Sequence, residues 1–123
     1  MSPPVSDFNP VHFSDLSETV LRALAEDIGS GDVTARLVPE AQRSTATVIS
    51  REAAVICGRP WFDRVFAELD GEVRIDWEVA EGARVAADTR LCTLRGLSRP
   101  LLTGERTALN FLQALSGTAT AVR

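Results

Sequence analysis

One arginine near the end of the chain lies where a helix would hold it toward a ligand. Apolar residues recur there at helical spacing, and at about 100° per residue a second arc of the same helix is polar. This polar ridge consists of Thr103, Arg106, Asn110 and Gln113. A guanidinium on a rigid helix suits a carboxylate ligand, in this subunit or in another one. The alternative is an ordinary solvated helix face.

Glu105 is the neighbour of this arginine, but its spacing places it in the leucine arc of the helix. An ionised carboxylate that is buried among leucines needs a partner. We therefore expect Glu105 to accept a hydrogen bond from a backbone N–H or to form an ion pair with an arginine.

The segment EDIGSGDVT, residues 26–34, is the second candidate, because its three acids suggest a cation site and its glycines a phosphate loop. Glycine loops that bind phosphate lead from a strand into a helix N-terminus. This segment follows an expected helix C-terminus and lacks the ligand spacing of an EF-hand. A structural corner is therefore favoured, in which Asp32 or Thr34 bonds the local backbone.

A third pattern, EVAEGARVAADTRLCTLRG over residues 78–96, is similar to the hammerhead corner of biotinyl and lipoyl carrier domains. Such carriers present a lysine at a hairpin tip. All 13 basic residues of this chain are arginines. Carrier function is therefore excluded, as are a Schiff-base lysine and a P-loop lysine in this chain.

Length and charge narrow the class of protein further. A chain of 123 residues suits one domain. The net charge of −4 disfavours nucleic-acid and membrane-surface partners, since both attract basic proteins. No apolar run reaches the roughly 20 residues that a membrane-spanning helix needs.

The cysteines and the histidine do not predict a metal site. Cys57 and Cys92 form no CxxC pair, and His12 is the single histidine. Zinc usually takes four such ligands, so we expect none. The N-terminus lacks the apolar core of a signal peptide, which predicts a cytoplasmic protein with reduced thiols.

The elements that must position these residues follow from periodicity and from glycine and proline signals. Residues 1–13 are expected to be poorly ordered. The expected elements are a helix from Ser14 or Asp15 to a stop at Gly29 with an Asp15–Glu18 capping box, strands over 45–50 and 53–57, a short helix opened by Pro60, strands over 73–77 and 91–94, and a helix from a Ser98 N-cap to Gly117. Closely spaced strands favour antiparallel pairing, and hence an α+β fold with helices on one face of a mainly antiparallel sheet.

Two strings carry a resemblance to a known family. EDIGSGDVT and ERTALNFLQALSGTAT, residues 26–34 and 105–120, closely resemble the N-terminal region of quinolinate phosphoribosyltransferases, also called nicotinate-nucleotide pyrophosphorylases (carboxylating). The strand order and the EGARV turn between them also follow that family. The likeness covers about residues 14–123.

The resemblance implies a fold of two parts, an N-terminal α/β sandwich with the hammerhead-like corner and an open α/β-barrel. The sandwich would comprise residues 14–117, with residues 118–123 starting the connection to a barrel that is absent from this chain. It implies a reaction of NAD biosynthesis, in which quinolinate and phosphoribosyl pyrophosphate give nicotinate mononucleotide, pyrophosphate and carbon dioxide with Mg²⁺. It also implies a homodimer in which Arg106 binds quinolinate in the neighbouring subunit's site.

By the same resemblance, the catalytic groups and the Mg²⁺ ligands belong to the barrel, so we expect no catalytic residue, no metal ligand and no turnover in this segment alone. Two alternatives remain. One is a related phosphoribosyltransferase-like protein with another ligand, such as the molybdenum-associated homologues, which lack the arginine of ER-x-ALN. The other is a non-catalytic interaction or dimerisation module.

Overall fold

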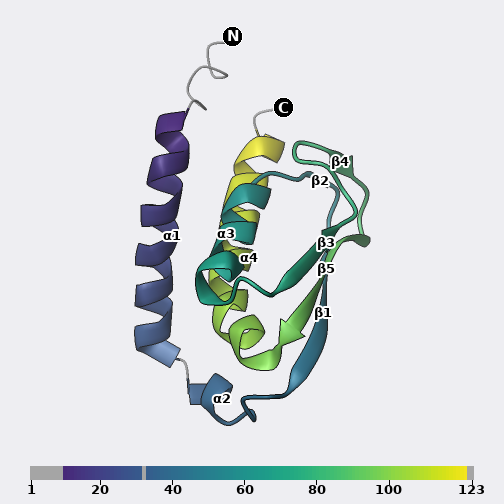
Figure 1. The fold of residues 1–123 in the computed structure, drawn as a ribbon. Coiled ribbons are helices and arrows are strands. Elements are labelled where there is room, and N and C mark those ends of the chain that lie inside the picture. The colour runs from purple at the N-terminus through teal and green to yellow at the C-terminus, as the bar shows by residue number, and fades with distance from the viewer. Residues whose placement is uncertain (1–9, 32, 122–123) are drawn as a thin grey trace.

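Helices and strands alternate along the chain in the predicted order of helix, strands, helix, strands and helix. The computed structural model describes residues 10–31 and 33–121. Its elements are α1 (Pro10–Gly31), α2 (Val33–Arg36), β1 (Arg43–Ser50), β2 (Ala54–Val55), α3 (Arg59–Leu69), β3 (Arg74–Trp77), β4 (Arg84–Val85), β5 (Thr89–Leu97) and α4 (Ser98–Ala121) (Figure 1).

The main sheet is antiparallel and has its last strand in the centre. β5 pairs with β1 on one side and with β3 on the other, which gives the order β1-β5-β3. β2 and β4 form a separate antiparallel ladder around the Glu81–Gly82 turn. The expected α+β class with a mainly antiparallel sheet and this β corner is confirmed.

A bulge in β5 explains why two consecutive residues of this strand are buried. Val48 of β1 pairs with Cys92, whereas the next residue, Ile49, pairs with Arg90, so Leu91 is the extra residue. A bulge interrupts the alternation of side chains between the two faces of a sheet. Leu91 and Cys92 are 3% and 0% exposed, and both contribute to the core.

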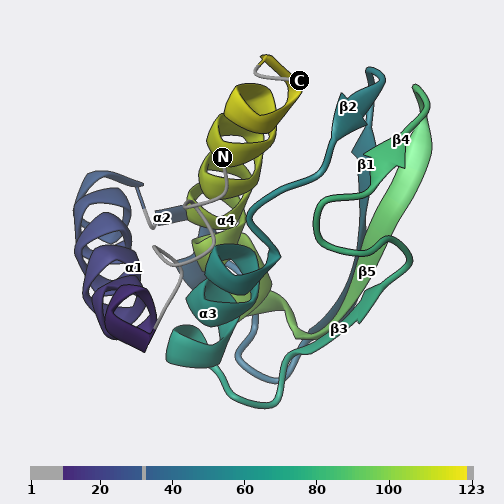
Figure 2. The ribbon, with the colours of Figure 1, turned by 90° about the horizontal axis from the view of Figure 1, so that it is seen from above.

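The long helices lie on one face of the sheet, as predicted, and they form two layers (Figure 2). Figure 2 shows α3 and α4 next to the sheet and α1 beyond them. The core between the sheet and the first helical layer contains Phe62, Val65 and Phe66 of α3 and Leu94 of β5. Burial of such side chains stabilises the fold by about 1.5–3 kcal/mol each. No helix of the described part of the chain is long and apolar enough to cross a membrane.

The helix that carries Arg106 follows β5 without a connecting loop. β5 ends at Leu97 and α4 begins at Ser98, where the sequence predicts it. Ser98 does not cap its own helix. Its N–H instead donates to Gln42 O at 2.8 Å, and its hydroxyl bonds the hydroxyl of Ser44 at the start of β1. Arg99 donates from Nε to Val38 O at 2.7 Å. These hydrogen bonds hold the start of α4 against the segment that leads into β1 and against the first residues of that strand, on both sides of Arg43.

Gly104 brings α4 into close contact with α3. An ideal Cβ at this position would lie 2.7 Å from Leu69 Cδ1, 2.9 Å from Phe66 Cε1 and 3.1 Å from Val65 Cγ1. Such distances are shorter than van der Waals contact, so a side chain does not fit there. The absence of a side chain at residue 104 therefore sets the distance between the two helices.

The predicted ends of the first helix are wrong. α1 begins at Pro10 rather than near Ser14, so Asp15 lies within the helix and not at its N-cap. It ends at Gly31 and not at Gly29. Both glycines give the same sequence signal for a helix end, so this signal alone does not show which of them ends the helix. Residues 1–9, part of the predicted disordered stretch, lie outside the described residues.

The C-terminal end of α4 was also predicted too early. The helix passes through Gly117 and continues to Ala121. Contacts beyond the glycine hold this last turn, because Thr120 Oγ1 accepts a hydrogen bond from Val55 N at 2.9 Å. Tertiary packing therefore overrides the low helix propensity of glycine.

Two glycines of α4 make a test of this packing possible. Gly104→Val should lower the free energy of unfolding by about 1–3 kcal/mol, because the new side chain overlaps α3. Gly117→Val should change it by less than about 0.5 kcal/mol, since nothing lies within 4 Å of its Cβ position. Urea denaturation of both variants measures the difference. Equal effects would contradict the close approach at residue 104.

Candidate functional site

The polar ridge of α4 faces outward, as its spacing predicts. Arg106, Asn110 and Gln113 are exposed and Thr103 is half-buried. On the other arc of the helix, Leu101, Ala108 and Leu112 belong to the buried core. The helix therefore holds the guanidinium of Arg106 away from the interior of the domain, where it is accessible to an external anion.

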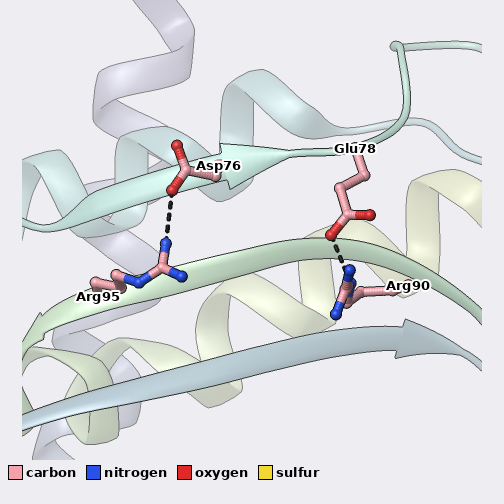
Figure 3. Close-up of polar contacts among 4 residues, drawn as sticks. All are labelled: Asp76, Glu78, Arg90 and Arg95. Carbon is pink, nitrogen blue, oxygen red and sulfur yellow. Dashed lines mark hydrogen bonds and ion pairs between the residues drawn. The ribbon is translucent and has the colours of Figure 1, made fainter.

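Arg106 forms no hydrogen bond or ion pair with any residue that the structure describes. Some of the other arginines are paired. On the sheet face that is turned away from the helices, Arg95 contacts Asp76 at 2.9 Å and Arg90 contacts Glu78 at 2.5 Å (Figure 3). These exposed pairs contribute about 0–1 kcal/mol each, but they compensate the arginine charges locally.

Exposure alone does not distinguish Arg106, because Arg22 on α1 is also exposed and has no partner among the described residues. The difference lies in the supporting helix. α4 contacts α3, α1 and the sheet, whereas α1 is the outer layer of the domain. A side chain in the middle of a helix that is held on several sides projects from a fixed position.

The predicted burial of Glu105 is wrong. Its side chain is exposed and contributes to the wall of a groove of about 590 Å³ between β1 and α4. The floor of this groove includes Phe62 and Phe66, and its rim includes Gln42 and Gln113. The sandwich is open along this side, so water reaches the carboxylate and no internal partner is needed. Within the described part of the chain, Glu105 has none.

The segment EDIGSGDVT contacts α4 on the side that faces α1, and not at this groove. Asp27 of α1 accepts a hydrogen bond from Thr107 Oγ1 of α4. A second cavity of about 300 Å³ lies beside this bond. Asp32 and the side chain of Thr34, expected to bond the local backbone, lie outside what the structure describes. No group of three or more metal-binding side chains comes together among the described residues.

Thr107 and Asp27 were not identified from the sequence as partners. Thr107 is 1% exposed, although it directly follows the exposed Arg106. A hydroxyl on the buried arc of a helix needs a hydrogen-bond partner, and this was the available signal. Nothing in the sequence showed that the partner lies 80 residues earlier.

The described groups with shifted pKa values, Cys57, Asp63 and Cys92, are not part of the polar ridge. Burial raises the pKa of Asp63, although the Trp77 indole N–H (2.7 Å) and the Arg59 guanidinium oppose this shift. Burial also raises the pKa of Cys92 to about 12. Arg59 lies over the Trp77 ring at 4.9 Å. Cys92 is 0% exposed and therefore serves as packing and not as a nucleophile.

The β corner fixes the start of α3 through one carboxylate. Glu81 accepts hydrogen bonds from the backbone N–H groups of Gly58 (2.8 Å) and Arg59 (3.0 Å). Gly58 has a φ of 113°, a left-handed conformation that glycine adopts without strain. Burial, and next the charge of Glu81, raise the pKa of Cys57. The corner thus has a structural role in capping α3.

Together, the fold and the site define a class of protein: an open α+β sandwich that presents a cation on its central helix. Residues 32–116 match the family described as "Quinolinate phosphoribosyl transferase, N-terminal domain". The chain therefore belongs to the quinolinate phosphoribosyltransferase N-terminal domain family, as the resemblance implied.

Individual relatives agree with this family. A probable nicotinate-nucleotide pyrophosphorylase (carboxylating) from Synechocystis sp. is 41% identical over 100 residues, which are 81% of this chain and 34% of the relative. The human nicotinate-nucleotide pyrophosphorylase (carboxylating) is 38% identical over 87 residues, 71% of this chain and 29% of that protein.

Solved structures show the same fold. The nicotinate-nucleotide pyrophosphorylase from Francisella tularensis is 42% identical with a TM-score of 0.80, over 85% of this chain and 38% of that chain. NadC from Streptococcus pyogenes is 34% identical with a TM-score of 0.81, over 92% and 40%. The chain thus spans about a third of the length of the curated relatives it matches.

Thiol reactivity tests the interpretation of the two cysteines. With iodoacetamide at pH 8, Cys92 should remain unmodified in the folded protein, because its thiol is inaccessible and its pKa is raised to about 12. Cys57 is half-buried and should react slowly. Peptide mass spectrometry with and without guanidinium chloride measures both rates. Native labelling of Cys92 as fast as that of Cys57 would contradict its burial.

Proposed function

We propose that this chain is the N-terminal domain of an enzyme that converts quinolinate and phosphoribosyl pyrophosphate to nicotinate mononucleotide, pyrophosphate and carbon dioxide in NAD biosynthesis. Its part in this reaction is to bind quinolinate. Arg106 extends from one subunit of a homodimer into the neighbouring subunit's site and pairs with a carboxylate of the substrate. The barrel of the neighbouring subunit supplies the reacting groups.

The observation that carries this proposal is the exposed guanidinium of Arg106 on α4, which has no partner among the described residues. Quinolinate is a planar dicarboxylate, and the planar fork of arginine pairs with carboxylates through two parallel hydrogen bonds. Membership of the family and the names of the relatives support the choice of this substrate.

The described residues do not fit a magnesium site, since no cluster of acids lies among them. We therefore propose that the magnesium ligands lie in the barrel. The cytoplasm is the proposed location, although some relatives carry mitochondrial or chloroplastic in their names.

Substitution of Arg106 in the full-length protein tests the proposed role. Arg106→Ala should lower kcat/KM for quinolinate by about 30-fold or more, since loss of one partner of a desolvated charge pair costs about 2–5 kcal/mol. Arg22→Ala is the matched control, because it removes another exposed helical arginine, and it should leave kcat/KM unchanged. The steady-state kinetics of both variants decide the assignment. An unchanged kcat/KM in Arg106→Ala would falsify it.

Subunit mixing tests whether Arg106 acts across the dimer. Arg106→Ala subunits are combined with subunits whose barrel site is inactivated. If Arg106 serves the neighbouring site, mixed dimers contain one complete site and regain activity. No recovery would mean that the arginine acts within its own subunit.

Two other results would favour a different function. Binding of a different ligand would favour a related transferase-like protein, and association without quinolinate binding would favour an interaction module.

A further inference from the structure

The two motifs of this chain are joined by a hydrogen bond between side chains. Asp27 belongs to EDIGSGDVT at the end of α1, and Thr107 belongs to ERTALN in α4. The Thr107 hydroxyl donates to Asp27 Oδ2, which makes it a bond to a carboxylate. Bonds of this kind are about twice as strong as those between neutral groups.

Burial makes this bond necessary for the position of α4. Thr107 is 1% exposed, and Asp27 is half-buried on the facing helix. If a buried hydroxyl loses its hydrogen-bond partner, the stability of the fold decreases by the full desolvation penalty of that hydroxyl. The cavity of about 300 Å³ beside the bond is lined by Glu26, Asp27 and Asn110, among others, so the two helices are not in close contact everywhere along this side. The bond therefore fixes the contact of α4 with α1 where packing is incomplete.

The same bond fixes the direction of the neighbouring arginine. Consecutive residues of a helix point about 100° apart, so the orientation of Thr107 determines that of Arg106. One turn earlier and about 60° around α4, Gly104 lies against α3 without space for a side chain. With residues 104 and 107 both held, α4 cannot rotate about its axis, and Arg106 points outward in one direction.

We infer that Asp27 is a positioning residue for substrate binding: through Thr107 it sets the orientation of α4 from which Arg106 reaches the dicarboxylate. This inference rests on the proposed function. It gives the Asp27 carboxylate a role other than metal or phosphate binding, because Asp27 accepts a hydrogen bond within the protein. Asp27 does not touch the substrate.

Kinetics of the full-length protein test this role with matched pairs of variants. Asp27→Ala removes the acceptor, and Thr107→Val removes the donor while keeping the side-chain shape. Each should lower kcat/KM for quinolinate about tenfold, mainly through KM, and leave KM for phosphoribosyl pyrophosphate unchanged. Asp27→Asn and Thr107→Ser retain an acceptor and a donor, and should remain within about threefold of the parent. They also keep the test open if Asp27→Ala does not fold.

Glu26→Ala is the control for charge. It removes an exposed acid from the same turn of α1 and from the same cavity, but it breaks no bond to α4. It should leave both KM values unchanged. A loss equal to that of Asp27→Ala would overturn the inference, since the local charge and not the bond would then matter.

A double-mutant cycle separates positioning from general stability. In an Arg106→Ala background, Asp27→Ala should have no further effect on kcat/KM, because the side chain that it positions is gone. An additional tenfold loss there, or equal losses for both substrates, would overturn the inference. If Arg106→Ala alone has no effect, the proposed function fails. If Arg106→Ala lowers kcat/KM and Asp27→Ala does not, only the inference about Asp27 fails.

Discussion

α4 contacts other elements of the domain on several sides, and its buried polar side chains must find hydrogen-bond partners on those neighbours. Four hydroxyls along it do so with four segments. Ser98 bonds Ser44 of β1, and Thr107 bonds Asp27 of α1. Further along, Ser116 bonds both the N–H and the carbonyl of Cys57, and Thr120 accepts from Val55 N. The polar contacts of α4 therefore specify which segment lies against each part of the helix, whereas the apolar contacts supply most of the stability.

This arrangement connects stability with the proposed function. The apolar arc of α4 holds the helix in the core, and the same rigidity holds the polar ridge outside it. A binding residue in a loop would lose conformational freedom when the ligand binds, whereas a residue on a fixed helix has already lost much of it on folding. The domain thus contributes orientation to a site whose reacting groups we assign to another part of the protein.

Local patterns predicted the elements well and their ends poorly. The alternation of Ile75 and Trp77 with charged residues predicted β3, and the leucine spacing predicted the buried arc of α4. Gly29 and Gly117 were wrong as helix ends, because a glycine signal is local while the contacts that extend a helix are not. Strand β5 was predicted too short, since its pairing with both β1 and β3 also depends on distant residues.

The candidate site was predictable in part for the same reason. Helical periodicity is enough to place Arg106 on the outside, and the structure agrees. It is not enough to show that the sandwich is open beside Glu105, because the shape of the groove depends on how far β1 lies from α4. The Asp27–Thr107 bond joins residues 80 positions apart, and no pattern within either motif contains this information.

The direct passage from β5 into α4 has a consequence for the evolution of this domain. Because Leu97 ends the strand and Ser98 begins the helix, no intervening loop can absorb a change in chain length. One inserted residue would rotate everything beyond it by about 100° and shift it by about 1.5 Å along the axis. The leucine arc would then turn partly toward water and the guanidinium away from its present direction. We therefore expect insertions and deletions to be excluded at this junction.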